Sequence, residues 1–295
     1  MHAGIYDVTA PLCLNDLGEA VVPRAKAVKF KLSTVGHDLL VTGTKAYKYL
    51  SNILEQDLHI GTHYDLPATF GYEFDITKLP VTYFIREAVI LDARSDNGER
   101  AIIKLRDVED LVDRLAFKGL SKEERPALII RTGYSKYWCV DNSKYMSFRG
   151  LDRDLTEFIA HELEPPILGF DAISVDKSIE YRSLSIYPEV DRDFIESIRD
   201  QEYLPFLNHD TLLRKGILII ENLYLEELPD YVNKALLIAI PSLRLKLRGR
   251  RASYAICAMP CRALMIYPPP TRESLFKDLE EIKDLLSIIA ATPKG

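Results

Sequence analysis

The stretch "ILIIEN", Ile217 to Asn222, is a run of apolar, mostly β-branched residues that ends on a carboxylate. Short apolar runs of this kind are typical of strands that are buried on both faces of a sheet. Comparable runs are "EAVILDA" (87–93), "ALIIRT" (127–132), "ILGFDAI" (167–173), "ALLIAI" (235–240) and "ASYAICAM" (252–259). The chain is therefore expected to build a sheet with a strongly apolar interior.

Helical periods lie between these runs. In "DVEDLVDRLAF" (107–117) and "RDLTEFIAHEL" (153–163), apolar residues recur at spacings of three and four. Asp107 is the expected N-cap of the first helix, because a carboxylate there can accept the free backbone N–H groups. The alternation of strands and helices predicts an α/β fold with a mixed sheet.

Composition limits the class of protein. The chain has 295 residues, 47% of them hydrophobic and 28% charged, so it can bury a sizeable core. The net charge of −6 and the pI of about 5.6 argue against a protein that mainly coats nucleic acid or an anionic membrane. No signal-peptide pattern or long apolar run is visible, and the four cysteines look like scattered reduced thiols. A cytoplasmic location is expected.

One break in composition divides the chain. Three consecutive prolines in "YPPPTRES" (267–274) precede a segment whose apolar residues have helical spacing. These apolar residues are Leu275, Leu279, Ile282, Leu286 and Ile289. We expect one domain over residues 1–266, followed over 267–295 by a Pro-rich linker and a C-terminal amphipathic helix that packs on the body or on a partner.

A cluster of metal-ligand residue types occurs in "DLHIGTHYDLPATF" (57–70), which contains His59, His63 and Asp65. Imidazoles with a carboxylate are ligands for zinc, manganese or ferrous iron. Gly61 permits a sharp bend, and His63 and Asp65 alternate, so both can point to one side of an extended segment. The alternative is that the histidines are partly buried and hydrogen-bonded in a turn.

Two further candidates lie later in the chain. His209 opens an apparent helix, and Glu221 ends the strand of "ILIIEN". Both positions are edges of elements, where a scaffold usually presents functional groups. Burying the Glu221 carboxylate alone would be costly, and either a cation or a buried salt bridge would offset that cost.

Several ordered blocks together resemble the metal-dependent cyclase family, which includes bacterial kynurenine formamidases and isatin hydrolases. The stretch "HIGTHYDLPATF" is similar to the family pattern H-x-G-T-H-x-D-x-P-x-H-F. Further similar blocks are "IYDVTAPL" (5–12), "RTGY" (131–134), "FDAISVD" (170–176), "HDTLLRKGILIIENL" (209–223), "LLIAIP" (236–241) and "RASYAICAM" (251–259). The resemblance spans residues 5 to about 259.

The resemblance implies a site and a chemistry. His59, His63 and Asp65 would hold a first divalent ion, zinc or manganese, His209 would help to hold a second, and Asp65 and Glu221 would bridge them. The family's chemistry is attack of a metal-bound hydroxide on an amide, formamide, lactam or lactone carbonyl. The resemblance also implies a three-layer swivelling β/β/α fold and a homodimer or larger homo-oligomer. No nucleic acid or membrane partner is expected.

The sequence departs from the family pattern at Thr69, where the family has a proton-transferring histidine. A threonine hydroxyl cannot exchange a proton readily near neutral pH, so activity on formylkynurenine itself is doubtful. His37 or His161 are alternative proton sources, although each is more simply a surface histidine. Two interpretations follow: a divergent arylformamidase-like hydrolase, or an inactive metal-binding protein of the same fold that acts as a binding or structural subunit.

The substrate is expected to be a small molecule. The aromatic residues close to the motif could line an aromatic substrate pocket, and they could equally belong to the core. They are Phe70, Tyr72, Phe74 and Tyr134.

Overall fold

The computed structural model of the chain describes residues 4–11, 28–35, 47–56, 58–59, 61–70, 72–94, 102–108, 117–122, 124–176, 206–242 and 256–270. Its strands are β1 Gly4–Asp7, β2 Val28–Val35, β3 Tyr47–Gln56, β4 His63–Asp65, β5 Ile85–Asp92, β6 Ile102–Ile103, β7 Ala127–Arg131, β8 Gly150–Leu151, β9 Ile167–Phe170, β10 Leu218–Glu221, β11 Lys234–Pro241 and β12 Ala258–Tyr267. Its helices are α1 Leu105–Val108, α2 Asn142–Tyr145, α3 Arg153–Phe158 and α6 Leu207–Arg214, with shorter or irregular turns η2 Pro67–Phe70, η3 Ile76–Lys78, η4 Val81–Phe84, η7 Ser135–Tyr137 and η8 Ile159–Leu163.

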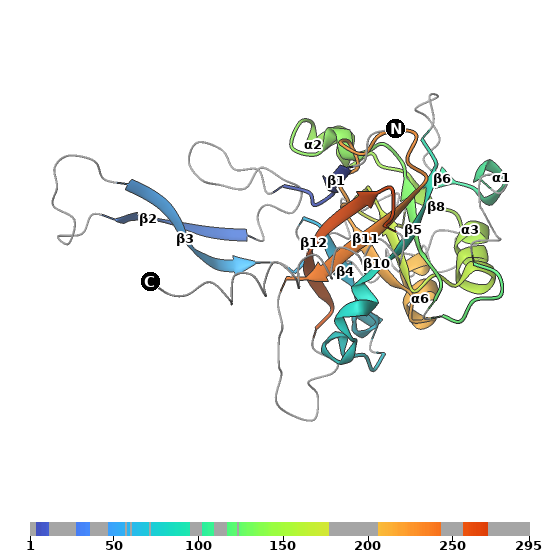
Figure 1. The fold of residues 1–295 in the computed structure, drawn as a ribbon. Helices are drawn as coiled ribbons and strands as arrows, with labels where there is room; N and C mark the ends of the chain where they lie inside the picture. Colours follow the sequence, from blue (N-terminus) through green and yellow to red (C-terminus); the bar gives the residue numbers. More distant parts are fainter. Residues whose placement is uncertain are drawn as a thin grey trace, which may run out of the picture.

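The main sheet closes into a barrel-like ring. Within the described residues its order is β1-β12-β11-β5-β7-β9-β10-β4, and β4 pairs with β12 as well as with β10. Strands β5, β7, β9 and β10 are parallel neighbours, whereas β4, β11, β12 and β1 join by antiparallel pairing. The prediction of an α/β fold with a mixed sheet is confirmed, and the sheet is closed on itself. Figure 1 shows the β2–β3 hairpin projecting from this body.

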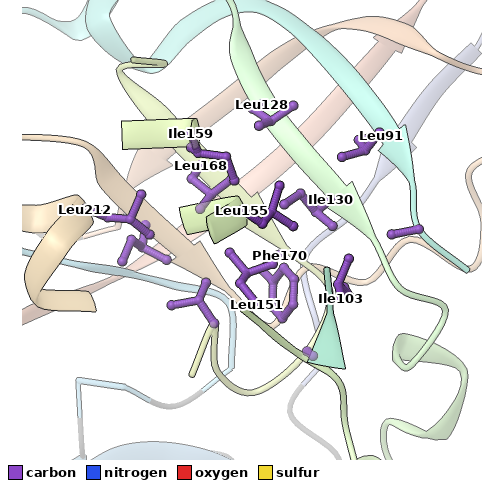
Figure 2. Close-up of a cluster of buried hydrophobic side chains, with 14 of the residues drawn as sticks. Leu91, Ile103, Leu128, Ile130, Leu151, Leu155, Ile159, Leu168, Phe170 and Leu212 are labelled. Carbon is purple, nitrogen blue, oxygen red and sulfur yellow. The ribbon is translucent and has the colours of Figure 1, made fainter. Parts of the chain in front are cut away.

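The apolar runs form strands because both of their faces are buried. Ile129 in β7 belongs to a cluster that also draws residues from β4, β5, β10, β11 and β12, and this cluster fills the interior of the ring. Its neighbours Leu128 and Ile130 face the other way, into a second cluster with Leu155 of α3 and Leu212 of α6 (Figure 2). A helical layer on the outside of the ring therefore buries the second face of the parallel strands, as such strands require.

Gly169 of β9 lies where this packing is tightest. A Cβ atom at Gly169 would lie 2.5 Å from Cδ1 of Ile129 and 2.7 Å from Cδ1 of Leu223. Glycine is required there because the side chains from both neighbouring elements close over the backbone.

The helices differ from the sequence-based prediction in their boundaries. Asp107 lies inside α1 and is not its N-cap, so that expectation is wrong. Its carboxylate instead accepts the backbone N–H of Lys104 at 3.4 Å, reaching back as an acidic residue in the first turn can. The helix predicted over 153–163 is α3 continued by η8, and Figure 1 shows α3 and α6 on the same side of the barrel, where they pack together.

Three other expectations concern the ends of the chain, the cysteines and the membrane. The predicted C-terminal helix falls on residues 271–295, which lie outside the described residues.

Cys139 is disulfide-bonded, so the expectation of reduced thiols is wrong for this residue, whereas Cys257 and Cys261 are free. In the part of the chain that the structure describes, no helix has the length and apolar character needed to cross a membrane.

Candidate metal centre

Strand β4 places His63 and Asp65 on the outer face of the ring. Tyr64 between them points into the barrel, where its hydroxyl donates to the Ala239 carbonyl at 2.7 Å. The bend before β4 uses Gly61, whose φ of 61° is the left-handed conformation that glycine adopts without strain. The two predicted features of this segment, a bend at Gly61 and alternation of His63 with Asp65, are present.

Hydrogen bonds hold this bend against the end of β10. The Thr62 hydroxyl donates to the Asn222 carbonyl at 2.6 Å and accepts the Ala10 N–H at 2.7 Å. The Asn222 side-chain amide donates to the Gly61 carbonyl at 3.0 Å, and its oxygen accepts the Tyr145 hydroxyl at 2.6 Å. Asn222 itself has a φ of 57°. The His63 loop is thus fastened to the residue that follows Glu221.

Glu221 reaches the same face from the neighbouring strand. It ends β10 and lies directly opposite His63 in the antiparallel register of β10 with β4. Its Oε1 atom accepts the Val175 N–H at 3.0 Å, so one lone pair of the carboxylate is occupied and the side chain is oriented.

Helix α6 supplies His209 in its first turn. Asp176 accepts the backbone N–H of Asn208 at 2.9 Å and that of His209 at 3.1 Å, which caps the helix from a distant loop. The same carboxylate lies 2.6 Å from Nδ1 of His209. Since Asp176 can only accept, Nδ1 carries the proton and Nε2 is turned towards the carboxylates of β4 and β10.

The five residues singled out in the sequence come together around the Asp65 carboxylate. His209 Nε2 lies 3.2 Å from Asp65 Oδ2 and 3.1 Å from Glu221 Oε1. His63 Nε2 lies 3.6 Å from Asp65 Oδ1 and 3.8 Å from Glu221 Oε2, and His59 Nε2 lies 3.5 Å from Asp65 Oδ1. One atom from each of His63, Asp65 and Glu221 lies within 4.8 Å of the others.

The environment of His63 fits a cation. Its Nδ1 atom lies 2.8 Å from the Gly61 carbonyl and therefore donates to it, which leaves a lone pair on Nε2. Nε2 is fully buried and has no hydrogen-bond partner among the described residues. A buried lone pair that faces two carboxylates is unfavourable by itself, and a divalent cation between them would satisfy all three groups.

The charges of the centre support the same conclusion. Burial opposes ionisation of Asp65, but the neighbouring His63 imidazole and a hydrogen bond from His209 hold the pKa of this carboxyl well below its usual range. Burial also opposes a charge on His209, yet the Glu221 charge and the bonds to Asp176 and Asp65 raise the pKa of the imidazole well above its usual value. Without an ion, a proton on His209 offsets the two carboxylates; a divalent ion would replace this proton.

Thr69 lies in η2, directly after β4, and is exposed. Its hydroxyl donates to the Cys257 carbonyl at 2.9 Å, so its proton is directed at the backbone. His161 lies in η8 on the surface, 3.1 Å from the Glu157 carboxylate, as expected of a helix-face histidine. His37 is outside the described residues.

The aromatic residues near the motif take different positions. Phe70 and Tyr134 pack against the helical-side cluster, and Phe74 packs against the barrel interior, as the core interpretation predicts. The Tyr72 hydroxyl donates to Asp210 Oδ1 at 2.7 Å and accepts from Arg214 Nε at 2.9 Å, which ties the segment after η2 to α6.

Sequence reasoning missed the supporting residues Asp176 and Asn222 and assigned no role to Phe206, which precedes α6. Asp176 lay in a stretch that resembled the family pattern, but its contact with His209 spans 33 residues, which no local signal reveals. The ring of Phe206 lies beside His209, with centroids 5.7 Å apart.

Comparison with known proteins agrees with this fold. The model of the Cyclase family matches residues 6–177, more than half of the chain. The chain therefore belongs to the Cyclase family.

Solved structures extend the likeness over most of the chain. Isatin hydrolase A from Ralstonia solanacearum is 18% identical, with a TM-score of 0.57 over 90% of this chain and 92% of that one. A predicted metal-dependent hydrolase from Bacillus stearothermophilus is 19% identical, with a TM-score of 0.56 over 90% and 99% of the two chains. No curated protein matches. At these identities the likeness establishes the fold.

Proposed function

We propose that the chain is a metal-dependent hydrolase or cyclase that acts on the carbonyl of an amide, formamide, lactam or lactone. The observation that carries this proposal is the buried Nε2 atom of His63, which lacks a hydrogen-bond partner in the described part of the chain and faces Asp65 and Glu221. Membership of the Cyclase family and the folds of the metal-dependent hydrolases support it.

The ligands divide by their geometry. His59 and His63 approach one oxygen of Asp65, whereas His209 approaches the other oxygen and Glu221. This division supports two places for a divalent ion: His59, His63 and Asp65 would hold the first, and His209 would help to hold the second together with Asp65 and Glu221. When bound, zinc or manganese would lower the pKa of a water molecule far below its value in bulk water and polarise the substrate carbonyl.

The chain's own contribution is to orient these groups before substrate arrives. Gly61 and Asp176 each hold a proton at the Nδ1 atom of a histidine, so that both Nε2 atoms face the carboxylates. The Val175 N–H holds Glu221. Such supporting contacts typically affect metal affinity or activity by about 10- to 100-fold.

Thr69 stands at the family's acid-base position, yet its hydroxyl donates to the Cys257 carbonyl. A role in tying η2 to Cys257 fits this contact better than proton transfer does. The proposed enzyme is therefore arylformamidase-like in its metal centre but uses a substrate or a proton route that does not require the histidine.

The contact of Thr69 also supports a second candidate, an inactive metal-binding subunit of the same fold. Without a histidine at position 69, a positioned acid-base worth about 10²- to 10⁴-fold is absent from that position. The five converging side chains favour the enzyme, because a binding subunit does not require two carboxylates and three imidazoles in one centre.

The cytoplasmic location and the homodimer remain predictions. The disulfide of Cys139 runs against the first, because disulfides are rare in reducing compartments. Size measurement in solution and fractionation of cells would test them separately from the chemistry.

The decisive experiment combines metal analysis with a substrate screen. Wild type reconstituted with zinc or manganese should hold up to two ions per chain, and His63→Ala should lose at least one, whereas the exposed control His161→Ala should lose none. Hydrolysis of formamides, lactams, lactones or imides by the loaded protein would support the enzyme. Full metal occupancy without any turnover would favour the binding subunit, and absence of metal would reject both candidates.

A further inference from the structure

Asn222, the residue after Glu221, holds a buried backbone conformation that favours glycine. Its φ is 57°, in the left-handed region, and the residue is only 3% exposed. Asparagine tolerates this region, but glycine adopts it without strain, so the backbone alone does not explain an amide side chain at this position. Both ends of the amide have hydrogen-bond partners. The side chain of Asn222 is therefore part of a buried polar network.

Gly61 and Tyr145 of α2 fix the direction in which this amide faces. The Gly61 carbonyl can only accept, so the Asn222 Nδ2 atom, 3.0 Å away, donates to it. The buried Tyr145 hydroxyl donates to Asn222 Oδ1 at 2.6 Å. A rotated amide would place two acceptors face to face at Gly61, which is costly in a buried site. The Tyr145 hydroxyl thus stabilises the orientation in which the amide reaches the His63 loop.

The Gly61 carbonyl connects this network to His63. It accepts the Nδ1–H of His63 at 2.8 Å as well as the amide of Asn222, and the two donor nitrogens lie 3.5 Å apart. A carbonyl that is held by two donors keeps its direction, and that direction holds the proton at Nδ1 and leaves the lone pair at Nε2. Nε2 is the buried atom that faces Asp65 and Glu221.

We propose that Asn222 and Tyr145 are positioning residues for His63. Tyr145 orients the Asn222 amide. The amide fixes the Gly61 carbonyl, which selects the Nδ1–H tautomer of His63. Because Asn222 directly follows Glu221, which lies opposite His63 in the register of β10 with β4, one residue couples the support of both side chains. The inference deepens the proposed function and rests on its metal centre.

The first measurement is the tautomer of His63 in the ion-free, full-length protein, by NMR with ¹⁵N-labelled histidine. In wild type, His63 should carry its proton at Nδ1. Asn222→Gly keeps the left-handed backbone and removes the amide, whereas Tyr145→Phe removes only the hydroxyl, and the share of the Nε2–H tautomer should rise in both. The control is Tyr64→Phe, which should leave the tautomer unchanged. Tyr64 is equally buried, and its hydroxyl donates at 2.7 Å to a carbonyl inside the barrel.

The second measurement is zinc affinity, by competition with a chelator. The dissociation constant should rise by about 10- to 100-fold in Asn222→Gly, the range for a lost support of a metal ligand. In Tyr145→Phe it should rise by about 2- to 10-fold, the effect of one hydrogen bond. Tyr64→Phe should bind zinc as wild type does, although it should lose a similar free energy of unfolding in urea to Tyr145→Phe.

The tautomer decides the role of this network even if wild type binds no zinc, a result that would reject the proposed function alone. A tautomer change in Asn222→Gly and Tyr145→Phe, but not in Tyr64→Phe, supports the positioning role. An unchanged tautomer in the first two variants, or an equal change in the control, would overturn it. If wild type binds zinc, undiminished affinity in both Asn222→Gly and Tyr145→Phe would overturn it as well.

Discussion

His209 Nδ1 lies 2.6 Å from Asp176 Oδ2, and the Asp176 carboxylate also accepts the first free N–H groups of α6. One side chain therefore caps the helix and fixes the proton of an imidazole that faces Asp65 and Glu221. The Asp176 carboxylate thus sets both the position of α6 and the tautomer of His209. Only a substitution that keeps the helix cap can separate these two properties.

Asp176→Asn is such a substitution. Asparagine caps helices about as well as aspartate, but it cannot hold the His209 proton with a charged acceptor. The dissociation constant for zinc, measured by competition with a chelator, should rise by about 10- to 100-fold. Asp152→Asn makes the same change at the cap of α3, where Asp152 accepts the Leu155 N–H, and should leave zinc affinity unaltered. Equal effects of the two changes would show that Asp176 acts through stability alone.

The ion-free protein should lose stability as pH rises. The pKa of His209 is raised above its ordinary value of 6.5 by its carboxylate partners, so its contribution is complete below pH 6.5 and disappears as pH passes the folded-state pKa. With chelator present, the Tm should fall across alkaline pH, and His209→Gln should flatten that slope. Bound zinc takes the place of the proton on His209, so the Tm of the zinc-loaded protein should not fall with pH. A fall of equal slope in the loaded protein would contradict this replacement.

Thr69→His tests whether a missing proton carrier limits the site. We expect lower activity on the native substrate with unchanged metal content, because the larger ring displaces the contact with Cys257 and crowds the site. Thr69→Val, which keeps the shape and removes the hydroxyl, isolates that contact. A rise of about 10²- to 10⁴-fold on a formamide or lactam would show instead that only the acid-base was lacking. Inactivity of wild type and Thr69→His on every substrate, at full metal occupancy, would favour the binding subunit.

Gly169→Ala should destabilise the barrel by about 1–3 kcal/mol in urea unfolding, because its Cβ would overlap Ile129 and Leu223. Ile129→Val removes the Cδ1 atom that lies nearest. In the background of Ile129→Val, the cost of the alanine should shrink, and this coupling is the measured quantity. If the effects of the two substitutions on unfolding free energy are additive, the cost of Gly169→Ala does not come from contact with Ile129.

The sequence predicted the fold best where the burial of an element matches the hydrophobic pattern of its residues. The parallel strands β5, β7, β9 and β10 were predicted because burial on both faces produces continuous apolar runs. The bend at Gly61 and the alternation of His63 and Asp65 were likewise visible, since each depends on neighbours in sequence. That these residues bind an ion remains a prediction.

Features that depend on long-range strand pairing could not be predicted from the sequence. Strand β4 has three residues, too few for a periodic signal, and its role depends on pairing with β10 and β12. For the same reason the closed ring could not be predicted from local pattern. The error at Asp107 has a different cause: acidic residues at the N-cap and in the first turn both accept free N–H groups at the start of a helix, so their sequence signals overlap.

The double pairing of β4 has a consequence for the order of events during synthesis. His63 pairs on one side with Glu221 and on the other with Pro260, so the strand that carries His63 and Asp65 gains its second neighbour almost 200 residues after it leaves the ribosome. Until β12 emerges, one edge of β4 has no partner within the sheet. The second edge of the strand that carries His63 and Asp65 is therefore closed only after all five candidate ligands have been synthesised.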